Sequence, residues 1–201
     1  MTIQKDDAYG QAIERVLFSK TEIAAAIDRL AVRIASDYSG QPLLLLGVLK
    51  GALYVTVDLA RAISRLPDGP SSIEVEYLAV SSYGNAVRSS GEVRLLKDTN
   101  ENITAKHVLV VEDIVDNGLT LQYLRSLVGG RNPASLAACV LFDKPYHRSV
   151  DVPLEYVGLV APDTFVVGYG LDYQEKYRNL PYLAQLRSFV FSEDKVVIKT
   201  S

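Results

Sequence analysis

An α/β fold, with a mostly parallel sheet flanked by helices, is the fold class that this sequence predicts. Two observations carry the prediction, and a third marks where the pattern ends. Short apolar runs of strand type alternate with segments of helical spacing through most of the chain. Those runs are apolar at nearly every position, as strands covered on both faces require. The alternation breaks down after residue 145, where short strand candidates are separated by loops.

Length and composition bound the class of protein. A chain of 201 residues, 48% of them apolar, can bury the core of a single domain. We therefore expect one domain, with a core over residues 16–145 and a small hood made of residues 146–201 together with the N-terminal segment. The net charge of −3 argues against a chain-wide basic surface for nucleic acid.

The sequence favours the cytoplasm. Residues 1–11 contain no apolar core of signal-peptide type, and no apolar stretch approaches the ~20 residues of a membrane span. Cys139 is the single cysteine, so no disulfide can form within the chain, which favours a reducing compartment. Cys139 lies inside an apolar run, where a cysteine more often acts as a small apolar residue than as a nucleophile.

The first helix is predicted at residues 21–38. One face of it carries a regular apolar series, made of Ile23, Ile27, Leu30, Ile34 and Tyr38. Thr21 suits the N-cap, and Ser39-Gly40 ends the pattern. The apolar run at residues 43–48 then predicts a buried strand.

A second helix and strand follow. Residues 51–66 have helical spacing and end at the Pro-Asp-Gly-Pro sequence of residues 67–70. Residues 72–82 alternate well enough to predict a strand. Residues 83–91 are small and polar, with two glycines and no apolar periodicity, and so predict a mobile loop.

The second half of the chain repeats the strand and helix order. A strand is predicted at residues 107–111, a helix at 119–128 and another strand at 135–142. The short strand candidates of the hood are residues 156–160, 165–167 and 189–191.

The most informative stretch is residues 108–120, Val-Leu-Val-Val-Glu-Asp-Ile-Val-Asp-Asn-Gly-Leu-Thr. A buried strand delivers the adjacent carboxylates Glu112 and Asp113 near its carboxyl end, where ligands of open α/β sheets bind. A glycine turn at a helix start offers backbone N–H groups to an anion, and the Thr120 hydroxyl adds a donor. Acidic groups beside such a cradle suit sugar hydroxyls or magnesium. The alternative, a solvated acidic pair before an ordinary turn, explains an isolated pair better than it explains the whole string.

This stretch resembles the binding motif for phosphoribosyl pyrophosphate in the purine phosphoribosyltransferases, specifically their hypoxanthine–guanine branch. Further segments follow in the same order and at similar spacing, namely Leu49-Lys50-Gly51, Ser82-Tyr83, Asp143-Lys144-Pro145, residues 165–173 and Arg178. The likeness runs from about Val16 to the C-terminus. It implies the fold of the type I phosphoribosyltransferases. It also implies an enzyme that transfers the 5-phosphoribosyl group to a 6-oxopurine, hypoxanthine and/or guanine. The products would be IMP or GMP and pyrophosphate, in purine salvage.

The resemblance implies which residues bind the phosphoribosyl donor. The ribose hydroxyls would be held, directly or through magnesium, by Glu112 and Asp113. The 5′-phosphate would be cradled by the turn made of Asp116, Asn117, Gly118, Leu119 and Thr120. The pyrophosphate would be held by Lys50, Gly51, Ser82, Tyr83 and Arg178. Residues 83–91 would close as a lid that excludes water. In this family the peptide between Leu49 and Lys50 can be cis.

The resemblance also implies a base site. Asp116 would exchange a proton with the imidazole edge of the purine, as general acid–base catalysis requires. Lys144 would donate to the exocyclic oxygen, Phe165 would stack on the base, and the Val166 backbone would meet its edge. Asp172, also in this site, would bind a second magnesium, so that the implied metal ligands are Glu112, Asp113 and Asp172. Taken alone, Lys144 could be a solvated residue at a strand end and Phe165 a core residue.

Three positions depart from the family pattern. Asn117 stands where Thr or Ser is usual, Leu119 where a basic residue sometimes occurs, and Ala52 where a second small residue, often Gly or Ser, is common. None of these changes removes a group that the chemistry requires. An amide at position 117 can still donate to a phosphate.

Two rival functions remain at this point. One is an enzyme of the same superfamily that prefers xanthine or a pyrimidine. The other is a non-catalytic regulator that binds RNA, which should carry a basic face. The expected partners are phosphoribosyl pyrophosphate and a purine base, with no nucleic acid and no membrane. The resemblance implies a homodimer or a homotetramer.

Overall fold

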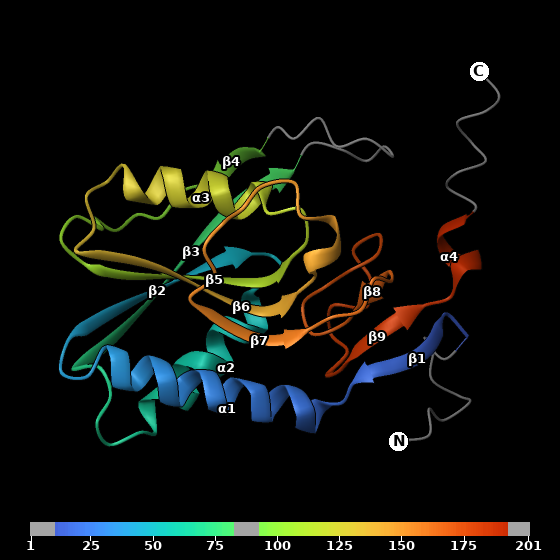
Figure 1. The fold of residues 1–201 in the computed structure, drawn as a ribbon, viewed down its shortest axis with the longest axis horizontal. Coiled ribbons are helices and arrows are strands. Elements are labelled where there is room, and N and C mark those ends of the chain that lie inside the picture. Colours follow the sequence, from blue (N-terminus) through green and yellow to red (C-terminus); the bar gives the residue numbers. More distant parts are fainter. Residues whose placement is uncertain (1–10, 83–92, 193–201) are drawn as a thin grey trace.

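A six-stranded sheet with helices on both faces forms the body of the protein (Figure 1). The computed structural model describes residues 11–82 and 93–192. Along the sheet the strands lie in the order β4-β3-β2-β5-β6-β7, with the bounds β2 (Pro42–Leu49), β3 (Ser72–Ser82), β4 (Val93–Lys97), β5 (His107–Val115), β6 (Ser135–Asp143) and β7 (Tyr156–Val160). Every neighbouring pair is parallel except β3 and β4. The predicted α/β fold with a mostly parallel sheet is thus confirmed.

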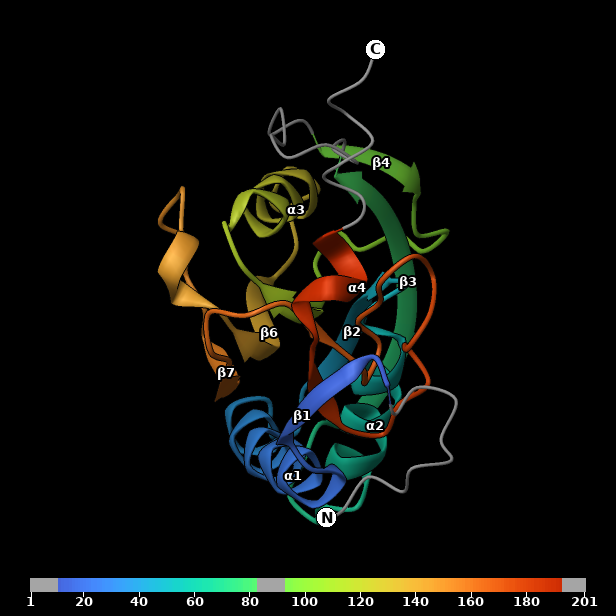
Figure 2. The same ribbon diagram turned by 90° about the vertical axis from the view of Figure 1, so that its right-hand side faces the viewer.

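Helices shield this sheet from water on both sides. Helices α1 (Lys20–Asp37) and α2 (Leu53–Ser64) cover one face and α3 (Leu119–Gly129) covers the other, as Figures 1 and 2 show. The central strands β2 and β5 are accordingly buried along almost their whole length. No helix among the described residues is long and apolar enough to cross a membrane.

The N-cap of helix α1 lies two residues earlier than predicted. It is Ser19, whose hydroxyl accepts a hydrogen bond from the Glu22 N–H at 3.3 Å, while the Glu22 carboxylate accepts from the Ser19 N–H at 2.8 Å. These reciprocal bonds make a capping box, which satisfies two otherwise unpaired backbone donors. The prediction of Thr21 as the N-cap is therefore wrong, because the glutamate partner lies three residues after Ser19.

Strand β5 is longer than its apolar run. It reaches Val115, because Ile114 pairs with Phe142 and Val115 with Asp143 on the neighbouring strand β6. Glu112 and Asp113 therefore lie within the strand and not just beyond it. Their backbone is held in the sheet, which fixes the place of both carboxylates.

A second, three-stranded sheet forms the hood. Its order is β1 (Ile13–Phe18), β9 (Leu183–Leu186) and β8 (Val166–Val167), and both pairs are antiparallel. It lies beyond the carboxyl ends of the parallel strands (Figure 1). A small apolar cluster of its own holds it together, made of Ile13, Val167, Tyr177, Leu180, Ala184 and Leu186.

Two segments expected in the hood have a different structure. Residues 156–160 pair in parallel with β6 and form the last strand of the main sheet. Residues 189–191 lie in a short helix, α4 (Ser188–Ser192), and not in a strand. A short apolar run does not distinguish strand from helix, so the tertiary neighbours decided both cases.

Cys139 lies in the middle of β6 and is fully buried. Burial raises the pKa of its thiol to about 12. The interpretation of Cys139 as a small apolar residue is confirmed, since a thiol with this pKa supplies almost no thiolate near neutral pH.

Candidate active site

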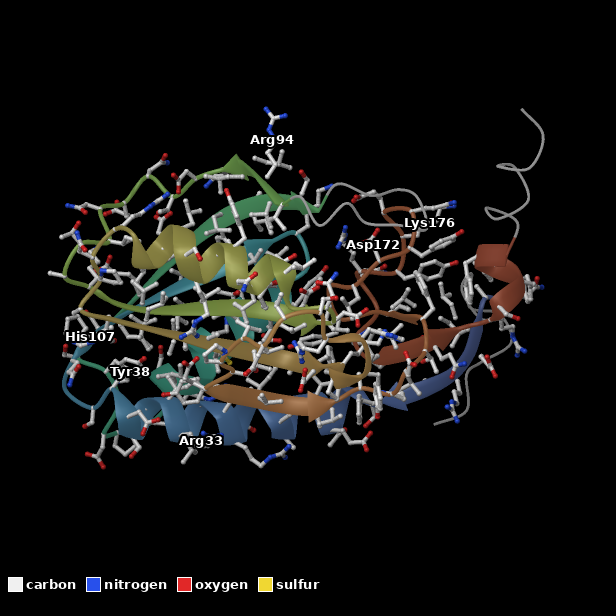
Figure 3. The ribbon with its side chains drawn as sticks, turned by 45° about the horizontal axis from the view of Figure 1, so that its top comes forward. Arg33, Tyr38, Arg94, His107, Asp172 and Lys176 are labelled. Atoms are coloured by element: carbon white, nitrogen blue, oxygen red, sulfur yellow. The ribbon has the colours of Figure 1, made fainter. Side chains whose placement is uncertain are left out.

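The predicted site residues gather where the main sheet ends and the hood begins. Strands β2, β5 and β6 are neighbours in the sheet, so their carboxyl ends lie side by side. Lys50 follows β2, Asp113 and Asp116 lie at the end of β5, and Lys144 follows β6. The hood adds Asp172, which Figure 3 labels at this end of the molecule.

Two adjacent buried acids lie at the centre of this edge. Glu112 and Asp113 are only 5% and 9% exposed. Burial raises the pKa of Asp113 to about 6, although backbone N–H groups and the nearby Arg178 act in the opposite direction. Burial, followed by the charge of Asp113, also raises the pKa of Glu112 well above its ordinary value. Acids with pKa values raised in this way are candidates for binding a cation or a hydrogen-bond donor from a ligand.

The loop after β2 lies directly against Asp113. A Cβ atom added to Gly51 would overlap the Asp113 carboxylate, so this approach requires glycine. The peptide between Leu49 and Lys50 is cis, as the resemblance allowed. The Lys50 ammonium pairs with Glu175 of the hood at 2.8 Å, and both side chains are about two-thirds exposed. An exposed pair of this kind contributes little stability.

The turn before α3 is closely packed. Gly118 has φ +86°, a left-handed conformation that glycine adopts without strain. The Asn117 side-chain oxygen accepts a hydrogen bond from the Leu119 N–H at 3.0 Å, and the Asn117 carbonyl accepts from Ser149 N–H at 2.9 Å. The Leu119 N–H is therefore already bonded inside the turn. The side-chain NH₂ of Asn117 is the part of that amide able to donate to a phosphate.

Asp116 and Lys144 lie together at the mouth of the site. The Lys144 Nζ is 3.5 Å from Asp116 Oδ2, and the Lys144 N–H donates to the Val115 carbonyl at 2.8 Å. Lys144 is 9% exposed, whereas the Asp116 side chain is 47% exposed. The alternative of a solvated lysine at a strand end is therefore wrong. The groups predicted to contact the imidazole edge and the exocyclic oxygen of a purine are therefore neighbours.

Phe165 is 42% exposed, which contradicts the alternative of a core residue. Its ring stacks on Phe191 of α4 with a centroid distance of 5.1 Å, and the Tyr173 ring meets it edge-on at 5.6 Å. The next residue, Val166, is buried in β8. An exposed aromatic ring held in place by other rings can serve as a stacking surface.

Arg178 and Asp172 form the hood side of the site. Arg178 Nη2 lies 2.7 Å from Asp172 Oδ1, and Arg178 Nη1 donates to the Gly170 carbonyl at 2.8 Å. The buried Nε of Arg178 has no hydrogen-bond partner within the described residues. A Cβ atom on Gly170 would overlap the Gly51 carbonyl oxygen, so the hood loop touches the loop after β2.

The predicted pair Ser82-Tyr83 spans the end of the first described range. Ser82 is the last residue of β3, while Tyr83 and the predicted lid at 83–91 lie outside the described residues. Within residues 11–82 and 93–192, no group of three or more His, Cys, Asp or Glu side chains is arranged to hold a metal ion. Glu112, Asp113 and Asp172 therefore form no closed cage around a metal.

The structure adds Arg148, which the sequence analysis missed. Its Nη2 pairs with Asp143, and its Cδ lies 3.2 Å from the position that a Cβ atom on Gly118 would take. Its buried Nη1 lacks a hydrogen-bond partner in the described part of the chain. No motif marks this residue, because an arginine in a polar loop is more often solvated. Only the packing of residues 148–150 against the turn brings it to the site.

Comparison with known proteins agrees with this geometry. The chain matches the family model for a phosphoribosyl transferase domain over residues 17–174. It is 43% identical over 179 residues to the hypoxanthine-guanine phosphoribosyltransferase of Bacillus subtilis (strain 168), covering 89% of this chain and 96% of that protein. The chain belongs to the hypoxanthine-guanine phosphoribosyltransferase family.

Solved structures of this phosphoribosyltransferase family share the fold. The hypoxanthine phosphoribosyltransferase of Staphylococcus aureus matches with a TM-score of 0.85 and 37% identity, covering 94% of this chain and 99% of that one. The main sheet and hood described above are therefore those of a type I phosphoribosyltransferase. The bifunctional protein TilS/HprT of Listeria monocytogenes is 43% identical over 181 residues, 90% of this chain. The chain spans only 27% of the length of that relative.

Proposed function

We propose that this family member transfers the 5-phosphoribosyl group of phosphoribosyl pyrophosphate to N9 of a 6-oxopurine. The base would be hypoxanthine and/or guanine, and the products IMP or GMP and pyrophosphate, in purine salvage. The observation that carries the proposal is the Asp116–Lys144 pair, 3.5 Å apart, at the same sheet edge as the buried Glu112 and Asp113. The named activities of the similar proteins support it.

The donor half of the site would bind the sugar and its phosphates. Glu112 and Asp113 would accept hydrogen bonds from the ribose hydroxyls. The turn at Gly118 would hold the 5′-phosphate with backbone N–H groups and the start of α3. The backbone at Gly51 and the Arg178 guanidinium would hold the pyrophosphate.

Magnesium fits the donor set that these residues provide. Glu112 and Asp113 are buried acids whose pKa values burial raises, and a divalent cation nearby would stabilise their charged forms. Magnesium commonly uses one or two carboxylates and completes its shell with water and substrate phosphate, so a closed protein cage is not needed. Each Asp172 oxygen accepts one contact and keeps a lone pair for a second ion. When bound, magnesium neutralises charge that develops on the leaving pyrophosphate.

The base half of the site would carry out proton transfer and recognition. Asp116 would take the proton from the imidazole edge of the purine as N9 attacks the anomeric carbon. Lys144 would donate to the oxygen at C6, which an adenine lacks. Phe165 would stack on the ring, with the Val166 backbone at its edge.

The remaining expectations are part of the same proposal. We propose a single domain, in which a core and a hood enclose the site, that works in the cytoplasm as a homodimer or homotetramer. The buried Cys139, the single cysteine of the chain, suits a reducing compartment. Residues 83–91, which follow β3 at the edge of the site, would be the lid.

A spectrophotometric assay tests this function. Phosphoribosyl pyrophosphate and magnesium are supplied with hypoxanthine, guanine, xanthine or adenine in separate reactions. We expect nucleotide from hypoxanthine or guanine, none from adenine, and loss of turnover when EDTA removes magnesium. The proposal would be contradicted if xanthine were the only base turned over, or if none of the four purines were turned over. In the latter case, RNA binding in a gel-shift experiment would support the regulator instead.

A further inference from the structure

Tyr169 is a residue of the hood whose side chain is hydrogen-bonded to helix α2, which packs on the main sheet. It is 8% exposed, and its hydroxyl donates to Asp58 Oδ2 of α2 at 2.6 Å. Burial, and next the hydrogen bond to Asp58, raise the pKa of Tyr169. Its ring also lies 6.2 Å from that of Tyr54, on the first turn of α2. A buried hydroxyl bonded to a carboxylate is among the stronger hydrogen bonds in a protein.

The backbone around Tyr169 has an unusual conformation. Gly168, Tyr169 and Gly170 all have positive φ, at +100°, +48° and +103°. For a residue with a Cβ this conformation costs free energy, so neighbouring contacts must maintain it. Two of these are the Tyr169 N–H to the Leu180 carbonyl at 2.8 Å and the Gly170 N–H to the Arg178 carbonyl at 3.0 Å.

The same loop forms one wall of the pyrophosphate half of the proposed site. Gly170 lies so close to the Gly51 carbonyl that no side chain fits between them. The Gly170 carbonyl accepts from Arg178, which in turn pairs with Asp172. The Gly51 loop leads directly into α2, the helix that carries Asp58. The Tyr169–Asp58 bond therefore joins the two segments that meet at Gly51 and Gly170.

Tyr169 and Asp58 lie outside the proposed substrate site itself. Both line a cavity of about 460 Å³ between α1, α2 and the hood, and no predicted site residue lines that cavity. Any effect of this pair on substrates must therefore pass through the loops at Gly51 and Gly170.

We propose that Tyr169 and Asp58 are a positioning pair for the pyrophosphate half of the site. The bond holds the hood loop, and with it Asp172 and Arg178, at the distance from Gly51 that a pyrophosphate requires. This inference rests on the proposed function. It predicts a selective effect, because Asp116 and Lys144 are held independently by β5 and β6.

The chain contains a matched control for this pair. The Tyr156 hydroxyl donates to Asp37 at 2.7 Å, and Tyr156 is 5% exposed. Burial, and next the hydrogen bond to its aspartate, raise the pKa of Tyr156 as they do for Tyr169. Asp37 is the last residue of α1 and precedes Tyr38, which Figure 3 labels at the end of the molecule opposite Asp172, so this second pair lies away from the proposed site. A purely structural role would make the two pairs equivalent.

The experiment compares Tyr169→Phe with Tyr156→Phe. Michaelis constants are measured for phosphoribosyl pyrophosphate and hypoxanthine in the forward reaction, and for pyrophosphate in the reverse reaction. For Tyr169→Phe we expect the KM values for the two diphosphates, phosphoribosyl pyrophosphate and pyrophosphate, to rise about tenfold, which is the effect of losing one hydrogen bond to a charged group. The hypoxanthine KM should stay within about twofold of wild type. Tyr156→Phe should lower the melting temperature by about as much as Tyr169→Phe does. It should leave all three KM values within about twofold of wild type.

Asp58→Asn supplies a rescue variant, because the asparagine oxygen can still accept from Tyr169. Its diphosphate KM values should lie closer to wild type than those of Tyr169→Phe. Equal changes in the two tyrosine variants, a parallel rise in the hypoxanthine KM, or unchanged diphosphate KM values would overturn the inference. If the wild-type protein turns over no purine, the proposed function fails. The pair is then tested by calorimetry, where Tyr169→Phe alone should weaken magnesium–phosphoribosyl pyrophosphate binding about tenfold.

Discussion

The main sheet has one end where its parallel strands begin, here called the amino edge, and one where they finish, the carboxyl edge. These two ends differ in how their polar groups are paired. Figure 3 labels Tyr38 and His107 at the amino edge of the parallel strands and Asp172 at the opposite end, next to the carboxyl edge. At the amino edge His107 Nδ1 lies 2.8 Å from the Ser135 hydroxyl, and the Tyr38 ring meets the His107 ring edge-on. Tyr156 bonds to Asp37 at the same edge. These groups find their partners inside the chain.

Two acids show the consequence of this difference. Burial would raise the pKa of Glu155 at the amino edge, but hydrogen bonds from Arg125 and the Ala138 N–H lower it overall. At the carboxyl edge, backbone hydrogen bonds and the nearby Arg178 do not offset the burial of Asp113, and its pKa is raised to about 6. The polar groups named at the amino edge are paired within the folded chain. The carboxyl edge leaves charges and donors that a ligand would satisfy.

The largest expected effect comes from Asp116→Asn, which removes the proposed base. We expect kcat to fall at least about 100-fold, within the range of general acid–base catalysis. The melting temperature should change by no more than about 2 °C, because the Asp116 side chain is half exposed. Asp37→Asn, at the amino edge, serves as the control and should keep kcat within about twofold of wild type. If both variants lose kcat equally, the functional contrast between the edges is not real.

A glycine at each edge gives the second test. Gly170 and Gly40 both have positive φ, but a Cβ at Gly170 would overlap the Gly51 carbonyl while a Cβ at Gly40 would meet nothing within 4 Å. Gly40→Ala should cost only the conformational term, about 1–2 kcal/mol of unfolding free energy. Gly170→Ala should cost more and should also reduce kcat/KM for phosphoribosyl pyrophosphate more than about tenfold. Urea denaturation and steady-state kinetics measure the two effects; equal costs would argue against close contact at Gly51.

The acids at the two edges should give stability slopes of opposite sign. Asp113 has a folded pKa of about 6, above its unfolded value of 3.8, so between these values the native state holds a proton that the unfolded state has released. Its contribution is therefore present below pH 3.8 and is lost as pH rises through 6, with a magnitude on the order of 1–3 kcal/mol. Urea denaturation in EDTA, comparing wild type with Asp113→Asn across this window, measures it.

Glu155 provides the reverse case. Its folded pKa is lowered, so its stabilising contribution is present above the unfolded pKa and is lost as pH falls through the folded pKa. Glu155→Gln should therefore remove stability near neutral pH and little of it in acid. Parallel pH profiles for Asp113→Asn and Glu155→Gln would show that the two acids are in similar surroundings, contrary to the structure.

The smallest effect is expected at Cys139, which belongs to neither edge. It lies in mid-strand and its thiol pKa is raised to about 12 by burial. Cys139→Ala should leave kcat/KM within about twofold, and thiol reagents should not inactivate the folded protein. Rapid inactivation by iodoacetamide that Cys139→Ala abolishes would show that this region opens in solution.

The sequence by itself determined the strands and helices that local periodicity encodes. The apolar runs of β2, β5 and β6 predicted buried strands, and the acids, asparagine and glycine at the end of β5 and just after it predicted an anion site at the start of α3. These signals are readable because each depends on residues close together in the chain. Lys144 and Phe165 could be assigned roles only through the resemblance to a family, because neither has a local signal of its own.

Only the tertiary structure decided the features that depend on distant residues. Strand β1 has mixed polarity and pairs with β9 at the other end of the chain, and residues 156–160 joined the main sheet because the edge of β6 was open to them. The Gly51–Gly170 approach and the Tyr169–Asp58 bond likewise join segments more than a hundred residues apart. A periodic pattern reports which face of an element is apolar. It does not report which other element covers that face, because the partner is selected by packing of the whole chain.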